Sequence, residues 1–147
     1  GSPQLDNKTL WVFANHLYVG GIWLKKQSKI SGFSSEENCP GTDKWELGKD
    51  IKFTVAISGK PESSVRRDYF YLPALGQYKK GKLTDLGKKG YYWASTPNPV
   101  NSGPESAGYG NVISANCLRF GTDPELNNVY VRNYYERYVG MQVQAFE

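Results

Sequence analysis

Side chains that commonly perform chemistry are scarce in this sequence of 147 residues. It contains one histidine, His16, and two cysteines, Cys39 and Cys117. His16 lies in an apolar, aromatic run, where a packed or capping histidine is more common than a catalytic one. Paired carboxylates for glycoside cleavage could come from Glu36, Glu37, Asp43 or Glu46, but neighbouring acids in a polar loop are usually only solvated charge. We therefore expect a protein that is not an enzyme.

Cys39 and Cys117 are far apart in the sequence, and no CxxC or Cys/His cluster surrounds them. Their spacing alone allows either two buried thiols or one structural disulfide. A bridge closing so long a loop would stabilise the fold by roughly 4 kcal/mol in the chain-entropy account. The sequence has no P-loop, GxGxxG, HExxH or EF-hand spacing. We expect neither a metal nor a cofactor.

Positive charge gathers in one segment. The chain has 18 basic and 14 acidic residues, and eight basic against three acidic residues lie between Lys60 and Gly90. A solvated surface is the commonest explanation, but such a patch could also attract a sulfated polysaccharide, a phosphate backbone or an anionic membrane. No nucleic-acid-binding motif accompanies it, so we expect no nucleic-acid partner. No stretch approaches the roughly 18 apolar residues of a membrane span, so we expect no membrane insertion. The candidate ligand-binding residues here are Lys79, Lys80, Lys82, Lys88 and Lys89.

Aromatic side chains are abundant, with 4 Trp, 11 Tyr and 6 Phe. Most must fill the core, and this includes Tyr92 and Trp93. Flat rings beside polar loops can also stack on the apolar face of a sugar or pack in a protein interface. The second group of candidate ligand-binding residues is therefore Tyr109, Tyr134 and Tyr135, together with the loop at 97–111.

The elements that position these residues are expected to be strands. Residues 51–57 alternate apolar and polar side chains, with Ala56 as the small exception, and strand-like runs also occur at 9–24, 112–120, 129–131 and 141–146. Two apolar, aromatic segments lie at 68–75 and 91–96. Residues 25–50 are predicted to form a long loop. No long segment keeps a helical period, and no linker splits the chain, so 1–147 is expected to be a single domain. Gly1-Ser2 resembles a cloning scar, which suggests that the chain was cut from a longer protein.

The order of pieces in residues 68–147 carries a family resemblance. The run DYFYLPALGQYKKGKLTDLGKKGYYWASTP, then ANCLRFG, then RNYYERYVGMQV, resembles the Fibrobacter succinogenes major paralogous domain. That family is common in secreted Bacteroidetes proteins, including tip and accessory subunits of fimbrillin-type fimbriae. Residues 2–59 match only loosely, and the closing motif has Gln144-Ala145-Phe146 where the family usually has Arg-Cys-Val. The matching positions are Leu72, Pro73, Ala74, Gly76, Gly81, Leu83, Gly87, Gly90, Tyr91, Tyr92, Trp93, Ser95, Thr96, Ala115, Leu118, Phe120, Arg137, Gly140 and Val143.

The resemblance implies an α+β fold similar to C-type lectins and formylglycine-generating enzymes, with short antiparallel strands, long loops and little helix. The enzymatic activity is not implied, because the reactive cysteine pair has no counterpart here. By similarity to the lectin domain of Legionella collagen-like adhesins, glycan binding is a family-level expectation. We expect an extracellular domain, on the cell surface or a fimbria, that binds host or microbial glycans or surface proteins. The alternative is a structural docking or capping module that contacts other fimbrial subunits and has no soluble ligand.

Overall fold

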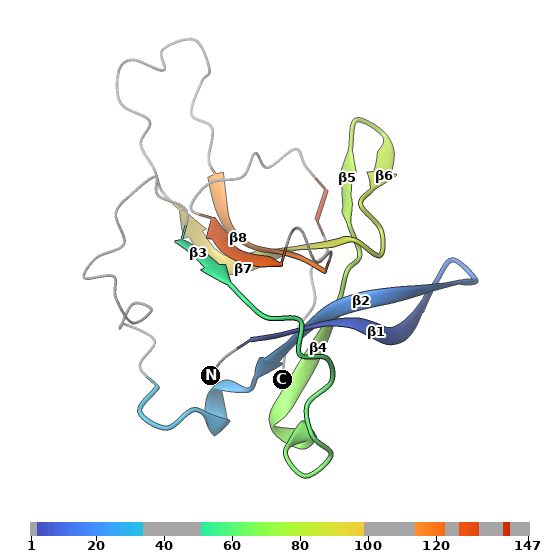
Figure 1. Cartoon of the computed structure of the whole chain (residues 1–147). Coiled ribbons are helices and arrows are strands. Elements are labelled where there is room, and N and C mark those ends of the chain that lie inside the picture. Colours follow the sequence, from blue (N-terminus) through green and yellow to red (C-terminus); the bar gives the residue numbers. More distant parts are fainter. Residues whose placement is uncertain (1–2, 34–50, 99–113, 123–126, 133–139, 142–147) are drawn as a thin grey trace.

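The computed structural model of the chain describes residues 3–33, 51–98, 114–122, 127–132 and 140–141 (Figure 1). Within them lie nine strands and two three-residue 3-10 turns. The strands pair into a three-stranded sheet in the order β1-β2-β4, a four-stranded sheet in the order β3-β9-β8-β7, and the separate hairpin β5-β6. In chain order the elements are β1 (Gln4–Phe13), β2 (His16–Lys25), η1 (Gln27–Lys29), β3 (Ile51–Thr54), η2 (Arg66–Asp68), β4 (Tyr69–Pro73), β5 (Gln77–Lys79), β6 (Lys82–Thr84), β7 (Lys89–Asn98), β8 (Ser114–Gly121) and β9 (Asn128–Arg132).

Strands β1 and β2 form a long antiparallel hairpin, drawn in blue in Figure 1. Its two-residue turn is Ala14-Asn15, with φ angles of 47° and 61°. Two consecutive left-handed residues make the turn that best follows the twist of paired strands. Strand β4 pairs with β2 only over Gly21–Lys25, so the outer half of the hairpin is a two-stranded ribbon.

A bulge interrupts β1 between Asp6 and Leu10. The Asp6 carboxylate, only 1% exposed, organises it. Asp6 accepts backbone hydrogen bonds from Lys8 at 2.8 Å and Thr9 at 3.0 Å, and side-chain bonds from the Thr9 hydroxyl and from Trp23 Nε1 at 2.9 Å. Burial alone would raise the pKa of Asp6, but these hydrogen bonds outweigh it and hold the pKa below its ordinary value. The side chain therefore serves the fold.

The core joins the two larger sheets. Its buried members are Leu5, Ile22, Leu72, Ala74, Tyr92, Phe120 and Val129. The Tyr92 and Phe120 rings lie nearly parallel, with centroids 6.2 Å apart. The Tyr92 hydroxyl donates to the Pro73 carbonyl at 2.6 Å and so ties β7 to β4. Burial raises the pKa of Tyr92, which keeps the hydroxyl protonated as a donor.

The α+β, C-type-lectin-like fold implied by the resemblance is wrong, because the chain is mainly β. The described residues contain no α-helix, and their helical content is limited to the turns η1 and η2. The physical reason is visible in the sequence itself. Apolar residues recur with a period of two, aromatic and β-branched residues fill the runs, and glycine and proline interrupt them.

Several strand predictions are confirmed within the described residues. The run at 51–57 contains β3, 112–120 overlaps β8 and 129–131 lies inside β9. The aromatic segment at 68–75 contains β4, and the one at 91–96 lies inside β7. The run at 9–24 is the β1-β2 hairpin, although β1 begins earlier, at Gln4. Tyr92 is buried as predicted, whereas Trp93 is only half-buried. The strand predicted at 141–146 lies almost entirely outside the described residues.

Candidate functional site

The predicted lysines gather on the β5-β6 hairpin. Lys79 and Lys82 are register partners across it, and Lys80-Gly81 forms the turn with φ angles of 51° and 75°. All three lysines are exposed. Their positive charges therefore meet at the tip of the β5-β6 hairpin, which Figure 1 draws at the upper right.

This arrangement carries an energetic cost in the unbound protein. Like charges directly opposite one another destabilise a strand pair. The ion pairs within the described part of the chain are Lys29–Asp68 at 3.9 Å and Lys89–Asp85 at 3.2 Å, and neither lies on the hairpin. An anion placed between the hairpin lysines would remove the repulsion. The chemistry of this end thus favours a sulfate, phosphate or carboxylate group.

Tyr78 and Leu83 form the adjacent register pair and lie on the opposite face of the ribbon from Lys79 and Lys82. The Tyr78 side chain is 54% exposed and Leu83 is 40% exposed. An exposed tyrosine ring can stack on a sugar or pack against a partner. Tyr78 is not among the candidate residues predicted from the sequence. The sequence feature that could have predicted its exposure on a hairpin is the alternation of apolar and polar residues on either side of the Lys80-Gly81 turn.

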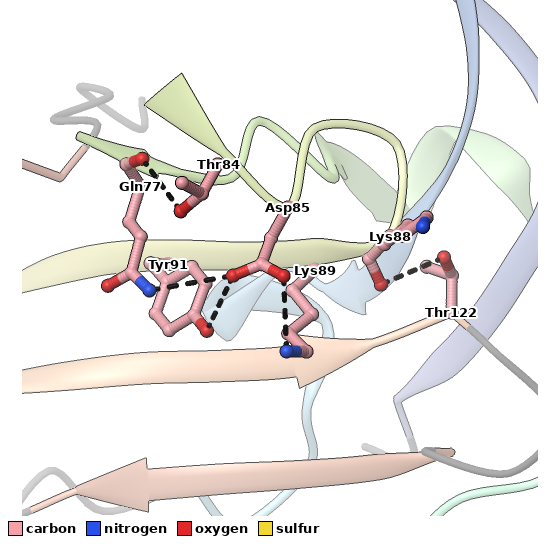
Figure 2. Close-up of polar contacts among 7 residues, drawn as sticks. All are labelled: Gln77, Thr84, Asp85, Lys88, Lys89, Tyr91 and Thr122. Atoms are coloured by element: carbon pink, nitrogen blue, oxygen red, sulfur yellow. Dashed lines mark hydrogen bonds and ion pairs between the residues drawn. The ribbon is translucent and has the colours of Figure 1, made fainter. Parts of the chain in front are cut away.

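The base of the hairpin is fixed by Asp85 (Figure 2). Asp85 has a left-handed backbone with φ of 62°, and its carbonyl accepts bonds from the Lys88 and Lys89 amides. Its carboxylate is within 3.2 Å of Lys89 Nζ, and it accepts longer bonds from Gln77 Nε2 at 3.5 Å and Tyr91 Oη at 3.4 Å. The carboxylate thereby joins the first strand of the hairpin to β7.

Lys88 and Lys89 therefore have different roles. The Lys89 ammonium is half-buried and paired with Asp85, so its charge is largely neutralised. The Lys88 side chain is exposed, and in Figure 2 its ammonium points away from Asp85. The backbone carbonyl of Lys88 accepts bonds from Thr122 Oγ1 at 3.2 Å and the Thr122 amide at 2.9 Å. Of the five predicted lysines, the structure brings Lys79, Lys80 and Lys82 together and leaves Lys88 at the base as a fourth exposed cation.

A row of alternating cations and rings crosses the four-stranded sheet toward Asp85. Arg119 Cζ lies 5.2 Å from the centroid of the Tyr130 ring and 5.8 Å from that of the Tyr91 ring. At the end of the row, Lys52 Nζ lies 5.7 Å from the centroid of the Tyr130 ring. Each contact joins register neighbours on adjacent strands. Cation–π contacts of this kind add modest stability. The Tyr91 hydroxyl donates to Asp85, so the row connects the four-stranded sheet to the base of the hairpin.

Two glycines hold the hairpin against the rest of the protein. A Cβ on Gly76, whose φ is 67°, would lie 2.0 Å from the Thr84 carbonyl oxygen. Gly140 pairs with the outer side of β5: the Tyr78 amide donates to the Gly140 carbonyl at 2.8 Å, and the Gly140 amide donates to the Tyr78 carbonyl at 3.0 Å. Strand β5 is thus hydrogen-bonded along both of its edges, to β6 on one side and to Gly140 on the other.

The remaining candidate residues are separated from this hairpin or lie outside the described part. Tyr109, Tyr134, Tyr135 and Cys39 are outside the described residues, as is most of the 97–111 loop. Cys117 is fully buried on β8, and its proposed pairing with Cys39 stays a prediction. His16 is exposed beside the turn of the β1-β2 hairpin, opposite Phe13. Within the described residues, no group of three or more His, Cys, Asp and Glu side chains is arranged to hold a metal ion.

Comparisons with protein families, curated proteins and solved structures give no match for this chain. In the described part of the chain, no helix is long and apolar enough to cross a membrane.

Proposed function

We propose that this chain is a non-catalytic binding domain whose β5-β6 hairpin recognises anionic glycans, sulfated ones foremost. The observation that carries the proposal is the convergence of Lys79, Lys80 and Lys82 at one exposed end of the hairpin, without an acidic partner among the described residues. The resemblance to domains of fimbrial and secreted proteins supports an adhesive role at the cell surface.

Affinity at such a site comes mainly from charge. Exposed lysines have strongly hydrated, mobile ammonium groups, so each contact to a sulfate contributes little. Tyr78 is exposed on the opposite face of the same ribbon, so its ring can add a contact only to a ligand long enough to reach both faces. We expect modest monovalent affinity, strong dependence on salt, and a gain in binding when many copies of the domain act together.

The proposal is tested on a glycan array that holds sulfated glycans beside their unsulfated counterparts. Binding is read at about 0.1 M salt, where the Debye length is roughly 10 Å, and at about 1 M, where it is roughly 3 Å. We expect sulfated glycans to be retained at the lower salt and released at the higher. No binding of any sulfated glycan at high protein density would overturn the proposal.

A matched pair of triple variants assigns the site. Lys79→Ala, Lys80→Ala and Lys82→Ala together should weaken binding at least about tenfold, equivalent to about 1.4 kcal/mol. The control removes the same number of charges from scattered exposed positions: Lys8→Ala, Lys60→Ala and Arg67→Ala. The control should retain most of the binding. Equal losses in the two variants would show a non-specific charge effect and no defined site.

A second candidate function is a docking or capping module without a soluble ligand. The observation favouring it is that β3 lies at the edge of the four-stranded sheet, and only β9 pairs with it among the described strands. An open sheet edge can accept a strand from a partner. Co-purification with neighbouring surface subunits distinguishes the two functions, because a capping module should be recovered in stoichiometric amounts.

A further inference from the structure

The outer face of the four-stranded sheet holds a tyrosine ring beside two cations. Phe120 on β8 and Val129 on β9 belong to the core. Successive side chains of a strand point to opposite faces, so Arg119 and Tyr130 lie on the outer face. Lys52 on β3 pairs with Tyr130 and shares that face. Arg119 Cζ and Lys52 Nζ lie 5.2 Å and 5.7 Å from the centroid of the Tyr130 ring, and we call these three residues the cation–ring cluster.

Solvent reaches the cation–ring cluster from the β3 side. Tyr91, the ring next to Arg119 on β7, is only 3% exposed. Arg119 and Tyr130 are half-buried, and Lys52 is exposed. A ligand would therefore approach over Tyr130 and Lys52 and not over Tyr91.

Neither cation of the cluster has a carboxylate partner in the described part of the chain. The ion pairs there are Lys29–Asp68 and Lys89–Asp85, and within the same residues the Arg119 guanidinium forms no hydrogen bond. A half-buried guanidinium has lost part of its hydration, which makes a missing counter-ion costly. Two like charges beside one ring also repel each other. The electrostatics therefore favour an anion with two oxygens, which the fork of an arginine binds through two hydrogen bonds.

The next register pair on the same face adds neutral polar groups. Thr54 pairs with Asn128, and the Thr54 hydroxyl donates to Asn128 Oδ1 at 3.4 Å. Among the described residues the NH₂ group of Asn128 has no acceptor. Sugars present hydroxyls around an apolar ring face, and a tyrosine ring can stack on that face. Two cations, a ring and an amide on one surface thus match an acidic sugar better than a bare anion.

We infer that the cation–ring cluster is a second ligand site, which binds an acidic sugar through its carboxylate or sulfate group. Arg119 and Lys52 hold the acidic group, and Tyr130 stacks on the sugar ring. The ligand class rests on the proposed function, but the site is separate from the lysine hairpin, because the contacts of Tyr91 with Arg119 and Asp85 lie between them. A glycan long enough to reach both sites would be held at two points.

The experiment titrates the whole chain with small sugars and follows ¹H–¹⁵N correlation spectra. Glucuronate supplies a carboxylate and glucose 6-sulfate supplies a sulfate, whereas glucose lacks the acidic group and inorganic sulfate lacks the ring. We expect a Kd of about 1–10 mM for at least one acidic sugar, and binding at least about tenfold weaker for glucose and for inorganic sulfate. The shifts should centre on residues 52–54, 119 and 128–130. Shifts confined to residues 79–82, no binding of either acidic sugar, or equal binding of inorganic sulfate would overturn the inference.

Matched variants assign the site. Arg119→Gln with Lys52→Gln should weaken binding of the acidic sugar at least about tenfold, and Arg119→Lys should weaken it severalfold because an ammonium lacks the fork. Lys52→Glu, at an exposed position, makes the same test without removing the contacts of Arg119 with its two rings. The control, Lys60→Gln with Arg67→Gln, removes equal charge from other exposed positions and should bind as the original chain does. Equal weakening in the control, or none in Lys52→Glu, would refute the assignment.

The hairpin variant distinguishes this inference from the proposed function. Lys79→Ala, Lys80→Ala and Lys82→Ala together should leave the Kd for the acidic sugar unchanged. Loss of the acidic sugar in that variant would place the site on the hairpin and overturn the inference. Binding of the acidic sugar at the cluster, without retention of any sulfated glycan on the array, would overturn the proposed function and support the cluster as a site.

Discussion

At the scale of single residues, Asp6 accepts more hydrogen bonds than any other carboxylate in the described part of the chain. It accepts four hydrogen bonds and joins the β1 bulge to Trp23 on β2. A buried charge is expensive unless such bonds replace its hydration, and here they do. The burial of Asp6 is thus explained by a structural role in positioning the hairpin.

Asp6→Asn tests that role. The amide keeps one acceptor oxygen but turns an NH₂ group toward a donor, so at least one buried donor loses its partner. We expect the free energy of unfolding to fall by about 2–4 kcal/mol. Urea denaturation at neutral pH measures the change. A loss below about 0.5 kcal/mol would contradict the structural role.

The same side chain makes stability depend on pH. The pKa of Asp6 in the folded protein lies below its ordinary value of 3.8. Its contribution is therefore complete above that value and is lost as the pH falls through the lower folded pKa. Urea denaturation between pH 5 and about pH 2 should show a steeper loss of stability for the original chain than for Asp6→Asn. Parallel curves would contradict this linkage.

Gly76 supports a second residue-scale prediction. Gly76→Ala combines a left-handed backbone with a Cβ only 2.0 Å from the Thr84 carbonyl oxygen, whereas Gly81→Ala shares the left-handed backbone but meets nothing within 4 Å. Backbone strain should cost each variant about 1–2 kcal/mol. The clash should cost Gly76→Ala a further 1–3 kcal/mol or so. Thermal unfolding of the pair isolates the clash, and equal stabilities would show that the hairpin base yields easily.

At the scale of elements, the two exposed hairpins are built alike but differ in chemistry. Each has a two-residue turn with both residues left-handed. The β1-β2 turn uses Ala14-Asn15, and the β5-β6 turn uses Lys80-Gly81. Around the first turn the exposed face is aliphatic, and around the second it is basic. The chain thereby separates an apolar surface from a charged one.

Ala14 is poorly suited to its position. Alanine in a left-handed conformation is strained, whereas asparagine adopts it readily and is preferred in this turn type. Ala14→Asn should raise the free energy of unfolding by about 0.5–1 kcal/mol, and Ala14→Val should lower it by more than about 1 kcal/mol. Urea denaturation checks both. The opposite order would contradict the turn geometry.

Strand positions follow largely from sequence because the period of two, the aromatic content and the glycine and proline breaks all act locally. The lysine hairpin could be predicted in part, since Lys79, Lys80 and Lys82 flank a Gly turn. The neutralisation of Lys89 could not be predicted, because it depends on the left-handed turn at Asp85. The exposure of Leu17 and Val12 also escapes a local argument, since alternation alone does not say which face of a ribbon is covered.

At the scale of the whole molecule, the α+β expectation failed because it came from similarity over residues 68–147 and not from any helical pattern. Those residues contain the glycines and aromatic rings that fit a strand-rich core equally well. Gly90 and Phe120 show this directly: a Cβ at Gly90 would lie 2.1 Å from Phe120 Cζ, so the β7-β8 pair needs a glycine where the ring packs. Glycine and aromatic positions that match a family pattern can therefore serve the packing of a different fold.

The pairing of Tyr78 with Gly140 has a mechanical consequence. Two backbone hydrogen bonds connect Tyr78 of the lysine hairpin to Gly140, a residue far along the chain. A force that pulls Gly140 away from β5 has to break these two bonds first. Such a force would therefore act directly on the hairpin proposed to hold the ligand.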